Sequence, residues 1–241
     1  MSPFVNIHTH FNSHIDNSEY VEIINIDIDN IVNVDVSHFY SVGIHPWESQ
    51  QTTDNCQQIC YKLTQQLSNL ATQNLGDLES QCLGDLNIKA IGECGLDRVC
   101  DVDFEIQKEV FLKQIELSEQ IAKPLIIHAV RTYPDIISIR KETKAKQAWI
   151  IHGFQANEQS AEQLLRHNGI YLSLGDVLYK NERRASELMK VIPLNRLFLE
   201  TDVAERDIVE VYERAASLSG IEMEKLRNDI FNNFVKIFGQ I

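Results

Sequence analysis

The amino-acid sequence predicts an α/β fold, a distorted (β/α)8 TIM barrel with an irregular first βα unit. Three observations lead to this prediction. Short apolar runs typical of strands alternate with amphipathic helices from about residue 38 onward. Eight such runs occur along the chain. Residues able to bind metal follow strand after strand, and in a barrel the functional groups gather where strands end. The length of 241 residues suits one large domain, so we predict a single domain over residues 1–241.

The predicted strands are brief, and several are almost continuously hydrophobic. Such runs are typical of strands that are covered on both faces, as in a parallel sheet. They cover Phe4–His8, Glu22–Ile28, Phe39–His45, Ile88–Glu93, Leu125–His128, Ala148–His152, Ile170–Leu174 and Leu197–Glu200.

Predicted helices separate most of the later strands. The last helix repeats apolar residues from Met223 to Phe238 at helical spacing, and Gly239 follows as a C-cap. Only a polar stretch, Phe11–Tyr20, lies between the first two strands, which predicts the irregular first unit. The other helices are predicted over Asp54–Leu70, Phe104–Ile121, Pro134–Lys144, Glu158–His167 and Glu182–Val191.

Composition restricts the location and the partners of the protein. No apolar run is long enough to cross a bilayer, and no signal peptide is evident, so we expect a cytoplasmic protein without membrane contact. The formal net charge of −13 argues against extended duplex binding, because proteins that neutralise many phosphates are usually basic. A local pocket for one phosphate stays compatible with this charge, since bound metal ions add positive charge.

The five cysteines do not form a disulfide framework. Cys56 and Cys60 resemble half of a zinc site, but no second pair follows at zinc-finger spacing. They share a predicted helical face with Leu63 and Leu67, which favours a place in the core.

Metal-ligating residue types recur where the predicted strands end. His8 and His10 are two residues apart in an extended segment, so their side chains point the same way. A lone histidine at a strand end is usually satisfied by a backbone carbonyl. Repetition is different, because unpaired charge beside a core is costly and metal binding neutralises it. We therefore predict a site for divalent ions built from His8, His10, Glu93, His128, His152 and Asp202.

The ordered motifs resemble the TatD family of metal-dependent hydrolases, often described as deoxyribonucleases, within the wider amidohydrolase-like barrels. The resemblance covers nearly the whole chain, and the ordered set is specific. It rests on Ile7-His8-Thr9-His10, Gly43-Ile44-His45-Pro46, Gly92-Glu93-Cys94-Gly95-Leu96-Asp97, Pro124-Leu125-Ile126-Ile127-His128, His152-Gly153-Phe154 and Glu200-Thr201-Asp202.

The resemblance implies a centre with two divalent cations, Zn²⁺, Mn²⁺ or Mg²⁺. His8, His10 and Asp202 would hold one ion, His128 and His152 the other, and Glu93 would bridge them. Two ions roughly 3.5–4 Å apart can activate a bridging water. Glu93 and Asp202 are thus the implied catalytic residues, with Asp202 also exchanging a proton with that water or with the leaving group.

Other residues have two interpretations each. His45 either contacts substrate at the mouth of the barrel or stabilises its turn. Arg131 stands where the family places an arginine, and it either binds phosphate through its forked donors or pairs with a loop carboxylate. Glu200 is expected to fix a loop by accepting hydrogen bonds, and Asp97 to shape a loop or support a ligand. Asn6 departs from the family, which often has aspartate there.

Three functional hypotheses follow. The leading one is hydrolysis of a phosphodiester, at the end of a DNA strand, by metal-activated water. A second keeps the metals but cleaves an amide, ester or lactone in a small molecule, which the fold alone does not separate from the first. A third is a metal-binding protein without catalysis. Both carboxylates and all four histidines are present, which argues against the third hypothesis.

Overall fold

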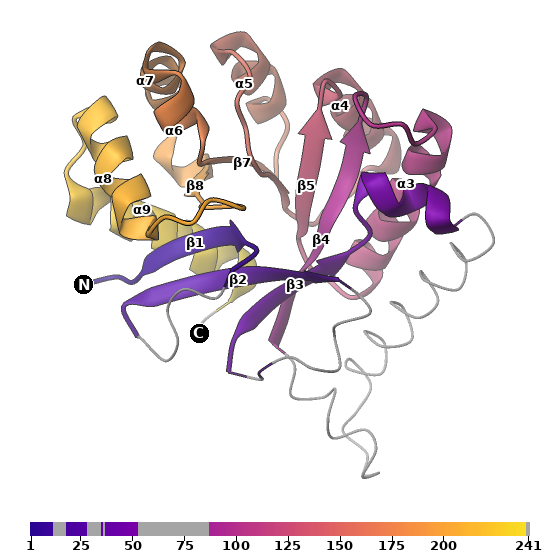
Figure 1. Cartoon of the computed structure of the whole chain (residues 1–241), viewed down its shortest axis with the longest axis horizontal. Helices are drawn as coiled ribbons and strands as arrows, with labels where there is room; N and C mark the ends of the chain where they lie inside the picture. The colour runs from indigo at the N-terminus through magenta and orange to yellow at the C-terminus, as the bar shows by residue number, and fades with distance from the viewer. Residues whose placement is uncertain (12–17, 28–34, 36, 53–86, 240–241) are drawn as a thin grey trace. The chain divides into compact units, whose positions relative to one another are not determined.

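A computed structural model describes residues 1–11, 18–27, 35, 37–52 and 87–239. The chain divides into two compact units, which are described separately below. The first unit comprises Met1–Ile24 and Ala148–Ile241, and the second comprises Asn25–Gln147 (Figure 1). The predicted helix Asp54–Leu70, with Cys56 and Cys60, lies outside the described residues, as does most of the stretch between the first two strands.

The first unit contains parallel strands from both ends of the chain. Strands that are consecutive in the sequence pair in parallel, β1 with β2, β6 with β7 and β7 with β8. The first and last strands also lie side by side, since the Asp202 backbone N–H donates to the His8 carbonyl at 3.0 Å and the His10 N–H donates to the Asp202 carbonyl at 3.2 Å. These strands cover Phe4–Thr9 (β1), Tyr20–Asp27 (β2, which contains the boundary between the units), Trp149–Ile151 (β6), Ile170–Leu174 (β7) and Leu197–Leu199 (β8).

Two helices of this unit were not predicted from the sequence, the four-residue α6 (Val177–Lys180) and α8 (Ile208–Ser219). The start and stop signals of α8 are nevertheless present in the sequence. Asp207 caps the helix by accepting from the Val209 N–H at 2.8 Å, and Gly220 ends it with φ of 69°. The others agree with prediction to within about two residues at each end. The helices are Glu158–Leu165 (α5), Val177–Lys180 (α6), Glu182–Val191 (α7), Ile208–Ser219 (α8) and Met223–Phe238 (α9), with a 3-10 turn at Leu194–Arg196 (η3).

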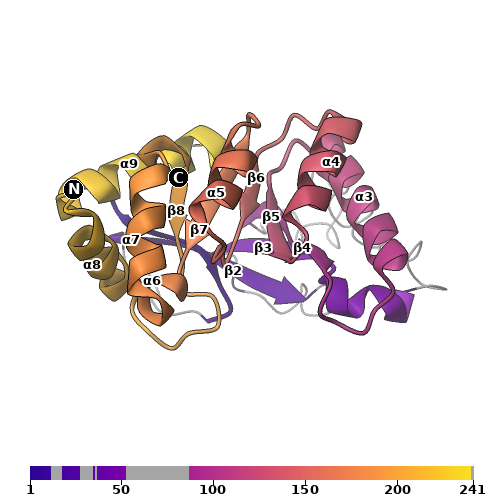
Figure 2. The same cartoon turned by 90° about the horizontal axis from the view of Figure 1, so that it is seen from above.

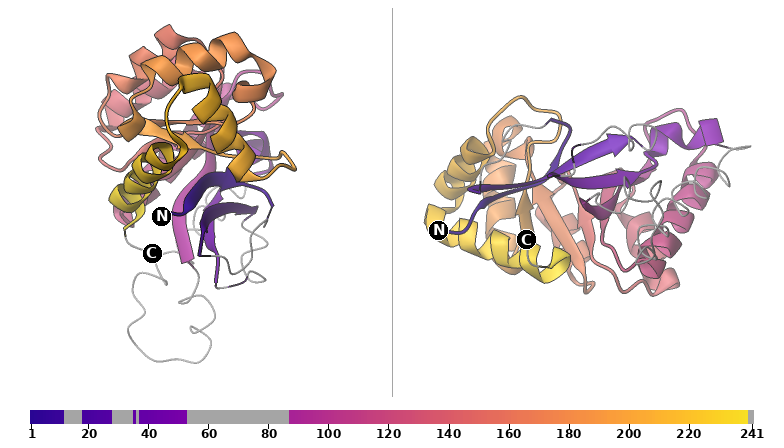
Figure 3. Two further views of the ribbon diagram at one scale, coloured as in Figure 1. Left: turned by 90° about the vertical axis from the view of Figure 1, so that its left-hand side faces the viewer. Right: turned by 90° about the horizontal axis from the view of Figure 1, so that it is seen from below.

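Helices α8 and α9 pack on β1 and fix it in place (Figure 3). The buried Tyr212 hydroxyl accepts from the Val5 N–H and donates to the Val5 carbonyl, both at 3.1 Å. The Arg227 guanidinium lies 3.8 Å from the centre of the Phe4 ring. These contacts fix the start of β1, and the hydrogen bonds with Asp202 fix its carboxyl end, where His8 and His10 lie.

The second unit contains three described parallel strands and the helices that pack on them. Helix α3 lies against β4, and α4 lies against β5 (Figure 2). Gln114 of α3 accepts from the Ile44 N–H at 2.8 Å and donates to the Ile44 carbonyl at 3.1 Å, which fixes the loop that carries His45. The elements are Phe39–Gly43 (β3), the 3-10 helix Pro46–Thr52 (η2), Asn87–Asp97 (β4), Phe104–Gln120 (α3), Leu125–Val130 (β5) and Tyr133–Thr143 (α4).

Strand β4 is longer than predicted and runs to Asp97 instead of ending at Glu93. Its last residues pair in parallel with β5, with Gly95 opposite His128 and Asp97 opposite Val130. Glu93 and His128 therefore lie inside the sheet and not after it. The sequence signal was hidden because Gly95 and Asp97 are residue types that strands usually lack.

Over the ranges that the structure describes, no helix combines the length and the low polarity needed to cross a bilayer.

Candidate metal centre

In the first unit, His8, His10 and Asp202 form a compact group of metal-ligating atoms. The Asp202 Oδ1 lies 3.5 Å from His8 Nε2 and 3.7 Å from His10 Nε2. Donor atoms bound to one ion at about 2.1 Å lie roughly 3.0–3.5 Å from each other, close to these distances. His8 is fully buried, whereas His10 and Asp202 are about one-third exposed, with side-chain exposures of 34% and 33%. The group thus has the composition and spacing of a divalent-ion site that water and substrate can reach.

Backbone geometry brings Asp202 to the two histidines. Asp202 adopts φ of 54°, a left-handed conformation that aspartate tolerates better than most residues. The preceding Thr201 N–H donates to the Asn6 Oδ1 at 3.0 Å, and the Asn6 amide donates to the Thr201 hydroxyl at 2.9 Å and to Glu22 at 3.1 Å. The buried Asn6 therefore forms hydrogen bonds through both the oxygen and the nitrogen of its amide. Although the family often has aspartate at this position, Asn6 still supports the loop that carries Asp202.

His152 directly follows β6 and is buried in the same unit. Its ring centre lies 4.4 Å from that of His8, and its Nδ1 lies 3.6 Å from Glu200 Oε1. Glu200 also accepts a hydrogen bond from the Gly153 N–H. The prediction that Glu200 fixes a loop by accepting hydrogen bonds is therefore confirmed, and the loop concerned is the one that carries His152.

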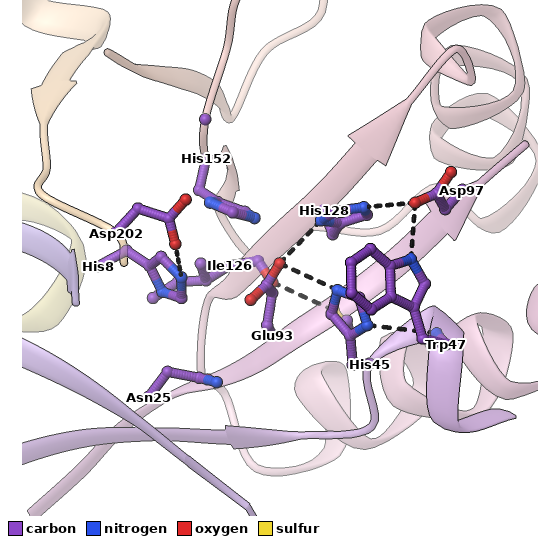
Figure 4. A network of polar contacts seen from close by, with 12 residues as sticks. His8, Asn25, His45, Trp47, Glu93, Asp97, Ile126, His128, His152 and Asp202 are labelled. Atoms are coloured by element: carbon purple, nitrogen blue, oxygen red, sulfur yellow. Dashed lines mark hydrogen bonds and ion pairs between the residues drawn. The ribbon is translucent and has the colours of Figure 1, made fainter. Parts of the chain in front are cut away.

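In the second unit, His45, Glu93 and His128 form another group of metal-ligating atoms (Figure 4). Glu93 Oε1 lies 2.9 Å from His128 Nδ1 and 3.3 Å from His45 Nε2. All three side chains are less than one-fifth exposed. A buried carboxylate between two imidazoles is a suitable arrangement for a divalent ion. His45, predicted to contact substrate or to stabilise its turn, is thus in direct contact with Glu93.

Asp97 supports His128 from the side opposite Glu93. Its Oδ2 lies 3.1 Å from His128 Nε2 and accepts from the Trp47 indole N–H at 2.7 Å, and its Oδ1 accepts from the Val99 N–H at 2.7 Å. Burial raises the pKa of Asp97, but the hydrogen bonds from Trp47, Val99 and His128 outweigh it, so the net pKa is lowered. The carboxylate therefore stays charged and favours a proton on Nε2, so that Nδ1, which faces Glu93, is the nitrogen that can ligate a metal.

Replacing Asp97 with asparagine is expected to weaken divalent-ion binding about 10- to 100-fold, as loss of such supporting carboxylates usually does. The dissociation constant for Zn²⁺, measured by competition with a chromophoric chelator, tests this. Asp135→Asn is the matched control, because Asp135 pairs with Arg98 in an exposed salt bridge. Equal affinities for the wild type and Asp97→Asn would contradict this role of Asp97.

Two side chains of the second unit, Arg131 and Trp47, are exposed to solvent. Arg131 follows β5, is exposed, and forms no salt bridge with any residue whose placement is described, so nothing here supports its pairing with a loop carboxylate. Trp47 was not singled out from the sequence, although it directly follows the motif Gly43-Ile44-His45-Pro46, which is a signal for a functional aromatic residue.

Known proteins with similar sequences are described as hydrolases. YabD of Bacillus subtilis (strain 168), named an uncharacterized metal-dependent hydrolase, is 40% identical over 100 residues, which cover 41% of this chain and 39% of YabD. YcfH of Escherichia coli (strain K12), named in the same way, is 29% identical over 147 residues, which cover 55% of each. The matches therefore span about half or less of the length of these relatives.

The fold is also found among solved structures. The TatD homolog YJJV from Escherichia coli k12 matches with a TM-score of 0.80 at 19% identity, covering 99% of this chain and 98% of YJJV. This likeness confirms the predicted fold class, a (β/α)8 TIM barrel.

A family model described as TatD related DNase matches residues 23–239. The match includes Glu93, His128, His152 and Asp202, and His8 and His10 precede it. Because it spans most of the sequence, the chain belongs to the TatD related DNase family.

Proposed function

We propose that this protein is a metal-dependent hydrolase that cleaves phosphodiester bonds at the end of a DNA strand. The observation that carries the proposal is the pair of ligand groups, each with imidazole and carboxylate donors at the spacing of atoms that share an ion. Membership of the TatD related DNase family supports the same chemistry.

The proposed ligand set follows the family resemblance. His8, His10 and Asp202 would hold one divalent cation and His128 and His152 the other, with Glu93 as the ligand common to both. Such ions, when bound, supply Lewis acidity and lower the pKa of a water molecule. Zn²⁺ suits the imidazole donors, and Mn²⁺ or Mg²⁺ suits the carboxylates. Elemental analysis of protein purified without chelator is expected to find about two ions per chain.

The chain's own residues then manage protons and position the substrate. Asp202 is proposed to accept a proton from the attacking water and to return it to the leaving oxygen, and its partial exposure beside two histidines supports this role. The net charge of −13 disfavours a long contact with duplex DNA, so the proposed substrate contact is confined to one phosphate and its neighbours.

Arg131 is proposed to bind the substrate phosphate through its forked donors. Replacing Arg131 with alanine is expected to raise KM for a DNA oligonucleotide roughly 10- to 100-fold, because a charge-assisted hydrogen bond is lost. The control is Arg183→Ala, which removes an exposed arginine paired with Glu187 on α7. An unchanged KM in Arg131→Ala would show that Arg131 does not bind substrate.

The decisive experiment is digestion of end-labelled single-stranded DNA with Mg²⁺, Mn²⁺ or Zn²⁺. We expect stepwise shortening by the wild type, and none with EDTA or with Asp202→Asn purified in parallel, which controls for contaminating nuclease. Small esters, amides and lactones are assayed with the same preparations. Turnover of one of these without DNA cleavage would replace the nuclease proposal with the small-molecule hydrolase. If the fully metallated protein shows no activity, a metal-binding protein without catalysis would be the remaining hypothesis.

A further inference from the structure

Trp47 is exposed to solvent and yet firmly anchored. Its exposure is 60%. Its indole N–H donates to the buried Asp97 carboxylate at 2.7 Å, and its backbone N–H donates to His45 Nδ1 at 3.2 Å. Because the indole nitrogen is already bonded, the surface that the ring offers to solvent is its carbon framework. The ring is therefore an apolar platform with a fixed orientation.

This platform lies directly beside one of the ligand groups (Figure 4). The ring centre of Trp47 lies 4.8 Å from that of His45, at an interplanar angle of 88°, and 6.1 Å from that of His128, at 76°. Single exposed hydrophobic residues are common on protein surfaces and usually need no explanation. Trp47 differs because the carboxylate that anchors it also holds His128, so whatever contacts the ring lies within a few ångströms of the candidate metal ligands.

We propose that Trp47 binds the substrate by stacking on a nucleobase adjacent to the scissile phosphodiester. This inference rests on the proposed function and names a group of the substrate that it contacts. Stacking on an aromatic ring needs only the flat face of a base, so it accepts all bases alike. Stacking also contributes binding energy that does not depend on positive charge, and this chain has a formal net charge of −13.

Tryptophan fluorescence tests the contact without requiring turnover. The chain has two tryptophans, and Trp149 is fully buried, so quenching by a ligand at the surface reports Trp47. The Mg²⁺-loaded protein is titrated with dAMP and, separately, with 2-deoxyribose 5-phosphate, which carries the same phosphate without a base. We expect saturable quenching by dAMP only, and none in Trp47→Phe. Equal behaviour of the two probes, or quenching that persists in Trp47→Phe, would overturn the proposal.

Steady-state kinetics distinguish the loss of base stacking from the loss of the hydrogen bond that Trp47 donates to Asp97. Trp47→Ala is expected to raise KM for a single-stranded oligonucleotide roughly 5- to 100-fold, the range for loss of one stacked base. Trp47→Phe keeps an aromatic face but loses the N–H donor to Asp97, so its KM is expected to stay within about threefold of the wild type while kcat falls. Leu112→Ala, at an exposed apolar position on α3, is the control.

The outcomes distinguish this inference from the proposed function. DNA cleavage with the same KM in Trp47→Ala and the wild type would overturn the stacking contact and leave the nuclease proposal standing. Base-dependent quenching by dAMP in a protein that cleaves no DNA would support the contact and refute the nuclease proposal.

Discussion

Replacing Asp202 with asparagine is expected to lower kcat for phosphodiester cleavage by about 1000-fold, which corresponds to the several kcal/mol that a metal centre contributes. Asparagine keeps the size of the side chain and also tolerates the left-handed backbone at this position. The change therefore removes the charge near His8 and His10, and with it the proton acceptor, while it preserves the loop.

Thermal unfolding distinguishes loss of the site from loss of the fold. The Tm of metal-free Asp202→Asn is expected to match that of the metal-free wild type, because the carboxylate is partly exposed and its backbone hydrogen bonds remain. Added Zn²⁺ is expected to raise the Tm of the wild type more than that of the variant, since an ion stabilises the folded state according to its affinity. Wild-type turnover by Asp202→Asn would remove Asp202 from the mechanism.

Replacing Gly95 with alanine is expected to destabilise the protein by more than about 4 kcal/mol or to prevent folding. A Cβ at this position would lie 2.1 Å from the His128 carbonyl oxygen and 3.1 Å from its carbonyl carbon. Both atoms belong to the backbone of β5, so no side-chain rotation relieves the clash. The backbone φ of 133° is also unfavourable for residues other than glycine. Urea unfolding followed by circular dichroism gives the change in free energy of unfolding.

Gly220→Ala is the matched control for this substitution. Gly220 also has positive φ, at 69°, but a Cβ there would meet nothing within 4 Å. Its cost is therefore limited to the left-handed conformation, about 1–2 kcal/mol. Similar losses in the two variants would show that the close approach of β4 and β5 at Gly95 does not determine stability.

Much of this fold was predictable, because its strands are short apolar runs with clear ends. Ile170–Leu174 is a strand with the bounds predicted, and Glu182–Val191 is a helix with the bounds predicted. The spacing of His8 and His10 also placed both histidines at the end of β1, where Asp202 meets them. Local patterns contain this information, since side-chain direction alternates along a strand.

Asp97 was expected to shape a loop or to support a ligand, and it does contact His128. Its partners were less predictable, because these residues lie far apart in sequence. Trp47 and Asp97 are 50 positions apart, and Asp97 and His128 are 31 apart. No periodicity signals such a contact, which exists only because β4 continues past Glu93 and pairs with β5. The hydrogen bonds between Asn6 and Thr201, which are 195 positions apart, likewise became visible only in three dimensions.

Strands β1 and β8 are adjacent in the fold but far apart in the sequence. The group of His8, His10 and Asp202 can therefore form only late in the synthesis of the chain. Asn6 and Thr201 are 195 positions apart, a delay of roughly 10–40 s at ribosomal rates. The donors of the second unit, His45, Glu93 and His128, all precede residue 148. A nascent chain thus carries His45, Glu93 and His128 while His8 and His10 still await Asp202, so the first group is the last to be assembled.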